Sequence, residues 1–285
     1  MISRSLSLDN TKDGKTMPKI ETRIQSFDGT QLYFSKDTVE NAKAAVVIVH
    51  GLAEHAGRYD YLTEKLNQRG FSVYRFDHRG HARSEGQRTF YKEFDHLIED
   101  VHVIVEAALQ ESGDLPLFII GHSMGGFATS SFGTKYPGKV KGIVLSGALT
   151  RYNTKVAGEL PMDLPAGTYF PNELGSGVCS DPAVVSAYAN DPLVEKQISV
   201  DLFNSLGNGI TWLKENAKQF TDPVLLLHGA NDGLVSEQDS RDFYGDIAST
   251  DKTLKIYAHL MHEIFNELTR DDVIEEAITW IEKRI

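Results

Sequence analysis

The sequence predicts an α/β fold in which a mostly parallel central sheet is flanked by helices and carries a helical insertion. Short apolar runs of strand length alternate with amphipathic segments of helical period from residue 20 to the end of the chain. One long segment interrupts this alternation. The composition is that of a globular protein, since 41% of the 285 residues are hydrophobic and 24% are charged.

Apolar runs rich in β-branched residues predict the strands. They cover residues 22–27, 31–36, 44–49, 72–76, 116–120, 142–146, 223–228 and 253–257. The first two are separated by the turn sequence FDGT and predict an antiparallel hairpin. Amphipathic helical patterns follow at residues 58–69, 94–112, 124–136, 236–248 and 270–284. This order predicts parallel strands with helices on both faces of the sheet.

The segment from residue 151 to 220 contains no convincing strand for the central sheet and holds most of the nine prolines of the chain. A segment of this length between two buried strands predicts a helical cap, or lid, over one end of the sheet rather than a plain loop. We therefore expect a flexible tail over residues 1–19, a core made of residues 20–150 and 221–285, and a cap over residues 151–220.

Charge and cysteine content restrict the partners and the compartment. The 29 Lys and Arg residues face 40 Asp and Glu residues, and the net charge of -11 opposes binding to nucleic acid or to an anionic membrane surface. The single cysteine, Cys179, excludes an internal disulfide and fits a reducing compartment. The first 19 residues lack the apolar core of a secretory signal, and no apolar run has the length of a membrane span. We therefore expect a cytoplasmic protein.

Ser123 lies in the stretch GHSMGG, where a buried strand gives way to a helical pattern. Gly121 and Gly125 leave room for a tight strand-to-helix turn that would expose the serine hydroxyl at the start of a helix. A nucleophilic serine needs its hydroxyl exposed in this way. The alternative is a glycine-rich turn whose serine only caps the helix. A nucleophilic role further requires a base, an acid and an oxyanion site elsewhere in the chain.

Two later strand ends supply an acid and a base in the chain order Ser, Asp, His. Asp232 follows the strand in PVLLLHGAND, and both His259 and His262 follow the strand in LKIY. Taken alone, Asp232 is typical of a turn residue, and a histidine at the start of a helix often has only a structural role. The candidates together occupy strand ends in the required order, which predicts a catalytic triad.

Stabilising an oxyanion requires two backbone N–H groups that point at the developing negative charge. The N–H of Met124, directly after the serine, is one candidate, because it lies at the start of a helix. The turn after the strand VVIVHG offers the N–H of Leu52, with Gly51 allowing close backbone approach.

Several stretches together resemble the monoacylglycerol lipase and lysophospholipase-like branch of the α/β-hydrolase family. They are HGLAEHAGRY, DHRGHARSEG, GHSMGG, DPL at 191–193, HGANDGLV, and DKTLKIY followed by HEIFNE. The similarity runs from about residue 20 to the C-terminus. It implies the α/β-hydrolase fold with an inserted helical cap, ester cleavage without a cofactor, and Leu52 and Met124 as the oxyanion donors.

The resemblance also separates the two histidines. In the family the catalytic histidine is followed by a glutamate or similar residue, and by a second glutamate five positions on. His262 has Glu263 and Glu267 at these positions, whereas His259 does not fit. The resemblance therefore implies that His262 is the base and that His259 is a neighbouring surface or packing residue.

Three further residues are candidates for substrate binding. Glu54 and Arg58, beside the oxyanion turn, are placed either to hydrogen-bond a glycerol-like alcohol or to form an ion pair that fixes the loop. Tyr188 matches a tyrosine position common in the family, and either presents its hydroxyl to the same alcohol or only packs. The stretch DHRGH lacks the spacing and the third ligand of a metal site, so no metal is expected. Ala82 stands where the family usually has glycine, and we expect its φ to be negative.

These features predict a cofactor-free serine hydrolase that cleaves esters of single acyl chains through an acyl-enzyme, as a monoacylglycerol lipase or lysophospholipase-like esterase does. Its expected partner is a small acyl ester. A feruloyl or short-chain carboxylesterase, or a thioesterase, would use the same triad, and a non-catalytic ligand-binding hydrolase fold is an alternative of another class. The sequence leaves open the oligomeric state, the acyl-chain length and any transient lipid or membrane contact of the cap.

Overall fold

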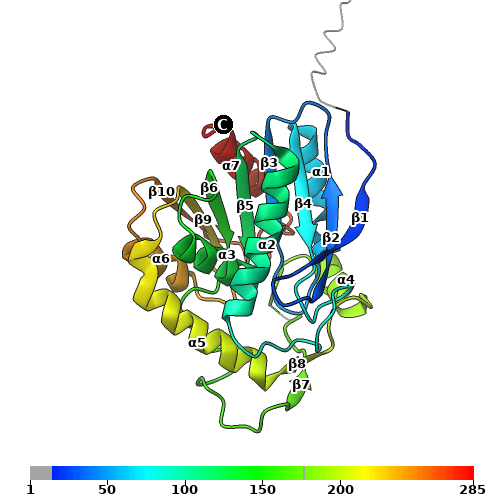
Figure 1. Cartoon of the computed structure of the whole chain (residues 1–285). Coiled ribbons are helices and arrows are strands. Elements are labelled where there is room, and N and C mark those ends of the chain that lie inside the picture. The colour runs from blue at the N-terminus through cyan, green and yellow to red at the C-terminus, as the bar shows by residue number, and fades with distance from the viewer. Residues whose placement is uncertain (1–14, 176) are drawn as a thin grey trace, which may run out of the picture.

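The computed structural model describes residues 15–175 and 177–285 and is built around an eight-stranded sheet with the order β1-β2-β4-β3-β5-β6-β9-β10 (Figure 1). Its strands are β1 (Ile20–Gln25), β2 (Gln31–Asp37), β3 (Ala44–Val49), β4 (Phe71–Phe76), β5 (Leu117–His122), β6 (Gly142–Ser146), β9 (Val224–Gly229) and β10 (Lys252–Tyr257). Every strand predicted for the central sheet is present.

The sheet is parallel except at one edge. Strand β2 pairs antiparallel with both β1 and β4, whereas β3, β4, β5, β6, β9 and β10 pair in parallel. The inner strands β3, β4, β5, β6 and β9 are buried along their whole length, which explains why they are almost continuously apolar. The predicted hairpin and the predicted parallel sheet are both confirmed.

Helices cover both faces of this sheet, as predicted. Helices α2 (Asp95–Ser112), α3 (Met124–Lys135) and α6 (Glu237–Asp246) contribute to one hydrophobic cluster, and α1 (Asp60–Gln68) and α7 (Arg270–Glu282) to the other. Figure 1 shows α2 and α3 in front of the sheet and α1 and α7 behind it.

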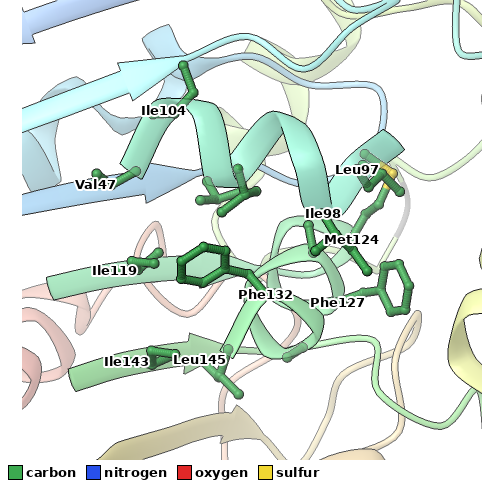
Figure 2. Close-up of a cluster of buried hydrophobic side chains, with 14 of the residues drawn as sticks. Val47, Leu97, Ile98, Ile104, Ile119, Met124, Phe127, Phe132, Ile143 and Leu145 are labelled. Atoms are coloured by element: carbon green, nitrogen blue, oxygen red, sulfur yellow. The ribbon is translucent and has the colours of Figure 1, made fainter. Parts of the chain in front are cut away.

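The core under α3 fixes the position of the residue that precedes this helix. Phe127 and Phe132 of α3 are fully buried in the same cluster as Ile119 of β5. Figure 2 shows the strand side chains of this cluster directed toward the face on which α2 and α3 lie. Because burying one phenylalanine stabilises a fold by about 1.5–3 kcal/mol, α3 is held firmly against the sheet. Ser123, immediately before α3, is held with it.

The insertion, residues 151–220, runs between β6 and β9. It contains β7 (Tyr169–Pro171), α4 (Pro182–Asn190), β8 (Gln197–Ser199) and α5 (Val200–Asn216). Side chains of Asp181 and Ser199 cap the N-termini of α4 and α5. Strands β7 and β8 pair with each other and not with the central sheet, and Figure 1 shows this segment at the lower end of the sheet.

The predicted tail lies mostly outside the described residues, which begin at residue 15. The described end of it is held to the loop after β2. The N–H of Met17 donates to the carbonyl of Thr38 at 2.9 Å, and the N–H of Glu40 donates to the carbonyl of Lys15 at 3.0 Å.

The expectation of a negative φ at Ala82 is wrong, because φ is +40°. This left-handed backbone lies in a tight series of turns in which the N–H of Ser84 donates to the carbonyl of His81. The N–H of Ala82 also donates to the carboxylate of Glu195, in the insertion, at 2.9 Å. These contacts fix a conformation that glycine adopts more easily than alanine.

Ala82→Gly should therefore raise the free energy of unfolding by about 1 kcal/mol or less. Left-handed backbone costs alanine roughly 1–2 kcal/mol, and the larger unfolded-state entropy of glycine offsets part of the gain. Urea unfolding followed by circular dichroism measures the change. The control, Ala107→Gly inside α2, should lose about 0.5–1 kcal/mol. An equal loss in the two variants would show that position 82 carries no strain.

Candidate active site

Ser123 occupies a strained turn between β5 and α3, with φ +55° and ψ -121°. The two flanking glycines make this turn possible. A Cβ atom at Gly121 would lie 2.4 Å from Thr129 Oγ1, and one at Gly125 would lie 2.2 Å from the carbonyl oxygen of Val49. The side chain of Ser123 makes no capping hydrogen bond to α3, which argues against the helix-capping alternative. The turn has the geometry that the glycines predict.

Asp232 and His262 come together at the carboxyl ends of β9 and β10. His262 Nδ1 lies 2.7 Å from Asp232 Oδ2. The other oxygen, Oδ1, accepts hydrogen bonds from the N–H groups of Leu234 at 2.9 Å and Val235 at 2.8 Å. Both side chains are buried, with 1% of Asp232 and 4% of His262 exposed. The carboxylate is therefore fixed in one orientation and directed at the imidazole.

The environment keeps Asp232 ionised. Burial opposes its charge, but the charge of His262 and hydrogen bonds from His228 and His262 outweigh burial and hold the pKa of Asp232 well below its usual value. For His262, burial disfavours the protonated form, and the Asp232 carboxylate more than compensates, so that the pKa of His262 is raised.

Ser123 and His262 line the same cavity as Leu52 and Met124. Gly51 permits the close approach of this loop, because a Cβ there would lie 3.1 Å from the Cβ of Ser123. Met124 is the first residue of α3, where the helix dipole is positive. The structure thus brings together the four residues at one end of the sheet.

Glu54, Arg58 and Glu263 form a buried ionic network beside this loop. Arg58 makes a bidentate pair with Glu263, with both N–O distances at 2.8 Å, and its Nη1 lies 2.6 Å from Glu54 Oε2. Glu54 Oε1 accepts hydrogen bonds from the N–H of Gly51 at 2.6 Å and the hydroxyl of Tyr59 at 2.7 Å. The ion pair considered from the sequence is therefore present, and it holds the loop that carries Gly51 and Leu52.

Glu54 and Arg58 stay ionised despite their burial. Burial alone would raise the pKa of Glu54, but the Arg58 charge and the hydrogen bonds lower it to about 2. Arg58 and Glu54 also line the cavity, so they remain within reach of a ligand.

Tyr188 lies in α4 and lines the cavity from the insertion. Its ring packs on the guanidinium of Arg58 at 4.9 Å, and its hydroxyl accepts a hydrogen bond from Asn172 Nδ2 at 2.8 Å. Burial raises the pKa of Tyr188 to about 12, so the hydroxyl keeps its proton. The hydroxyl proton is thus available as a donor.

The insertion supplies most of the apolar cavity wall. Lining residues from this segment include Tyr152, Val156, Leu174, Val178, Phe203 and Leu206. Two contacts hold the segment to the loop after β3. His55 Nε2 lies 2.8 Å from Asp191 Oδ2, and the N–H of Glu195 donates to the carbonyl of Ala53 at 2.8 Å.

Glu267 links the histidine loop to the same insertion. Its carboxylate accepts hydrogen bonds from the N–H of Met261 at 2.9 Å, the N–H of Ser180 at 3.2 Å and the Ser180 hydroxyl. The glutamate five positions after His262 therefore has a structural task. His259, in contrast, is exposed and does not line the cavity.

Sequence reasoning missed two histidines of this site. His122, directly before Ser123, lines the cavity, and its ring centroid lies 4.6 Å from that of His262. Burial and the nearby His262 lower the pKa of His122 to about 3, so this ring stays neutral. His228 contacts Asp232 at the end of β9. Its place at a strand end, four residues before the aspartate, is the signal that would have drawn attention to it.

The described residues offer little for other kinds of site. Within residues 15–175 and 177–285, there is no group of three or more His, Cys, Asp or Glu side chains arranged to hold a metal ion. Burial raises the pKa of the Cys179 thiol to about 12, which makes it a poor nucleophile. In this part of the chain no helix is both long and apolar enough to cross a membrane.

Comparison with known proteins links this geometry to a family. The model of the family described as "Serine aminopeptidase, S33" matches residues 40–269. A monoacylglycerol lipase of Mycolicibacterium smegmatis is 34% identical over 250 residues, which cover 84% of this chain and 88% of that protein. A monoglyceride lipase of Mus musculus is 32% identical over 254 residues, covering 85% and 84%.

Solved structures and a bacterial phospholipase extend the comparison. The crystal structure of Paleococcus ferrophilus monoacylglycerol lipase matches with a TM-score of 0.77 and 30% identity, covering 89% of this chain and 99% of that one. A soluble variant of Saccharomyces cerevisiae monoglyceride lipase has the same fold, with a TM-score of 0.82, 23% identity and 99% of both chains covered. Phospholipase YtpA of Bacillus subtilis is 29% identical over 251 residues, covering 85% of this chain and 96% of that protein.

The ionic network makes a prediction about stability. Arg58→Met leaves the buried Glu54 and Glu263 carboxylates without a counter-charge and should lower the free energy of unfolding by about 3–5 kcal/mol at pH 7. Urea unfolding at several pH values measures it. Without Arg58, burial should raise the folded-state pKa of Glu54 above its unfolded value, so the destabilisation is present above that raised pKa and is relieved as falling pH protonates the carboxyl. The loss caused by the substitution should therefore shrink at pH 4.

The matched control for this experiment is Arg241→Met, which removes an exposed ion pair with Glu237 within α6. Such pairs contribute roughly 0–1 kcal/mol. Similar losses in the two variants, or a loss at Arg58 that does not depend on pH, would contradict the buried-charge explanation.

Proposed function

The chain belongs to the serine aminopeptidase S33 family and has the α/β-hydrolase fold, and we propose that it is a carboxylic ester hydrolase specific for esters of single acyl chains. Monoacylglycerols are the preferred substrates, and lysophospholipid-like esters are close chemical relatives of them. The observation that carries this proposal is the buried hydrogen bond between Asp232 and His262, because His262 lines the same cavity as the strained Ser123.

In the proposed mechanism, Ser123 Oγ attacks the ester carbonyl while His262 Nε2 takes the hydroxyl proton. Asp232, at Nδ1, holds the imidazole in the required tautomer and stabilises the imidazolium. The N–H groups of Leu52 and Met124 bind the oxyanion, and each such donor contributes about 3–4 kcal/mol in the transition state. His262 then gives the proton to the leaving alcohol. Water, activated in the same way, hydrolyses the acyl-enzyme and regenerates Ser123.

The polarity of the cavity walls supports the choice of substrate. Glu54, Arg58 and Tyr188 form a polar wall for a small alcohol such as glycerol, whereas the insertion contributes apolar side chains for one acyl chain. We assign residues 151–220 as the cap that encloses this chain. Relatives named for monoacylglycerol hydrolysis favour this assignment over a feruloyl esterase, a thioesterase or a non-catalytic binding protein.

The location and the lipid contact form part of the same proposal. We assign the protein to the cytoplasm, because its single cysteine fits a reducing compartment. Val156 and Leu164 of the insertion are 43% and 48% exposed, and they support a transient contact of the cap with lipid aggregates that deliver the substrate.

The triad assignment predicts the ranking of four variants in ester turnover. Ser123→Ala should remove almost all activity. The residual rate should be at most about 10³ to 10⁴-fold above that of the uncatalysed reaction in water, which is what remains when a triad member is lost. His262→Ala should be nearly as damaging, because triad members act as a unit. Asp232→Asn should lower kcat by about 10⁴. His259→Ala, the matched histidine control, should retain most activity, and the reverse order of the two histidines would refute the choice of base.

The apolar wall of the cavity predicts substrate selectivity. A buried chain gains about 0.8 kcal/mol per CH₂, so kcat/KM should rise with acyl length until the cavity is full. A triacylglycerol has three chains and no free hydroxyl, and it should be a poor substrate. The measurement is kcat/KM for mono-, di- and triacylglycerols of medium chain and for methyl ferulate at equal detergent. Equal rates on mono- and triacylglycerol would contradict the enclosed site, and a tenfold preference for ferulate would replace the proposed substrate.

A further inference from the structure

We propose that His228 is a positioning residue of the active site, which holds the Asp232 carboxylate in register with His262 while Ser240 fixes the tautomer of His228. The proposal concerns a side chain that touches no substrate and acts through Asp232. Its catalytic meaning rests on the proposed function, because it assumes that Asp232 and His262 belong to the triad.

The hydrogen bonds of His228 determine its tautomer. Nε2 lies 3.1 Å from Asp232 Oδ2 and 3.0 Å from the carbonyl oxygen of Val235. Both are acceptors, so Nε2 carries the proton and donates to both. Nδ1 lies 2.7 Å from Ser240 Oγ and accepts the hydroxyl proton. His228 is fully buried, with 0% of it exposed, so water does not compete for these bonds.

His228 and His262 contact the same oxygen of Asp232. Oδ2 lies 2.7 Å from His262 Nδ1 and 3.1 Å from His228 Nε2. A hydrogen bond donated by His228 withdraws negative charge from this oxygen and thereby weakens its attraction for a protonated His262. Loss of that donor should make the carboxylate more basic, stabilise the imidazolium of His262 and raise the pKa of His262.

Ser240 is well placed to serve as a fixed support, because its helix is anchored to the core and to the insertion. The neighbouring Asp239 is fully buried, and its carboxylate accepts hydrogen bonds from the N–H groups of Arg151, Tyr152 and Asn153 at 2.9–3.0 Å. In the first turn of α6, Asp239 thus holds the start of the insertion, and Ser240 orients His228.

Two substitutions separate the donor from the rest of the ring. His228→Gln can place an amide N–H near the position of the imidazole Nε2 and keep the bond to Asp232. His228→Asn is shorter and reaches only the position of Nδ1, so it loses this bond. Both remove the aromatic ring, and purely structural effects should appear in both as a lower melting temperature.

The readouts are the acid limb of the pH profile of kcat/KM and the titration of His262, followed by NMR on histidine-labelled protein. The remaining titratable groups that face His262 are unchanged in every variant, and they are Asp232, Glu54, Glu263, Arg58 and His122. Differences between variants therefore report on His228.

His228→Asn should raise both the acid-limb pKa and the NMR pKa of His262 by about 0.5–1 pH unit, whereas His228→Gln should stay close to the wild type. Ser240→Ala, which removes only a hydroxyl, should raise both pKa values by a smaller amount. It replaces His228→Asn as the test variant if His228→Asn does not fold. Unchanged pKa values in His228→Asn and Ser240→Ala, or equal shifts in the Gln and Asn variants, would overturn the proposal.

The NMR titration also separates this proposal from the proposed function, because it does not need turnover. An NMR shift in His228→Asn together with a wild-type protein that hydrolyses no ester would refute the function and leave the contact between His228 and Asp232 established. An active enzyme without the shift would refute the positioning role alone.

Discussion

The strained backbone at Ser123 is the constraint on which the rest of the site depends. A residue with φ +55° and ψ -121° costs roughly 1–3 kcal/mol, and it persists only where its surroundings fix it. Here α3 is held against the sheet by buried side chains such as Phe127 and Phe132. The glycines at 121 and 125 let the helix start close to the strands. The strained turn thus places the Ser123 hydroxyl at the end of the sheet where β9 and β10 also end.

Buried charge is the second requirement, and the fold meets it with hydrogen-bond donors rather than solvent. Asp232 receives two backbone and two histidine hydrogen bonds, and the carboxylates of Glu54 and Glu263 share one arginine. Because a buried carboxylate without partners is costly, these networks also restrict where the loops can lie. The same loops hold the insertion through His55, Ala53 and Glu267, so the insertion is tied to the residues around the cavity.

Periodicity and chain order predicted the elements of the sheet and the candidates Ser123 and Asp232, because each depends on local pattern and on its place after a strand; they left His259 and His262 open, and the family resemblance selected His262. The contact of His122 with His262 depends on which strand ends become neighbours, and no local pattern carries that information, whereas His228 lies only four residues before Asp232 and could have been noticed. The resemblance pointed to Glu267 without explaining it, and the explanation came from Ser180, far away in the chain. Ala82 was misjudged because a methyl group was taken to exclude a positive φ, whereas tertiary contacts impose it.

The most direct test of the account is the site at which a fluorophosphonate ester reacts with the protein. Intact-mass analysis should show the addition of one probe per chain, and peptide mapping should place it on Ser123, since the account makes this hydroxyl the activated nucleophile. Modification at another residue, or no mass increase under conditions that label other serine esterases, would contradict it.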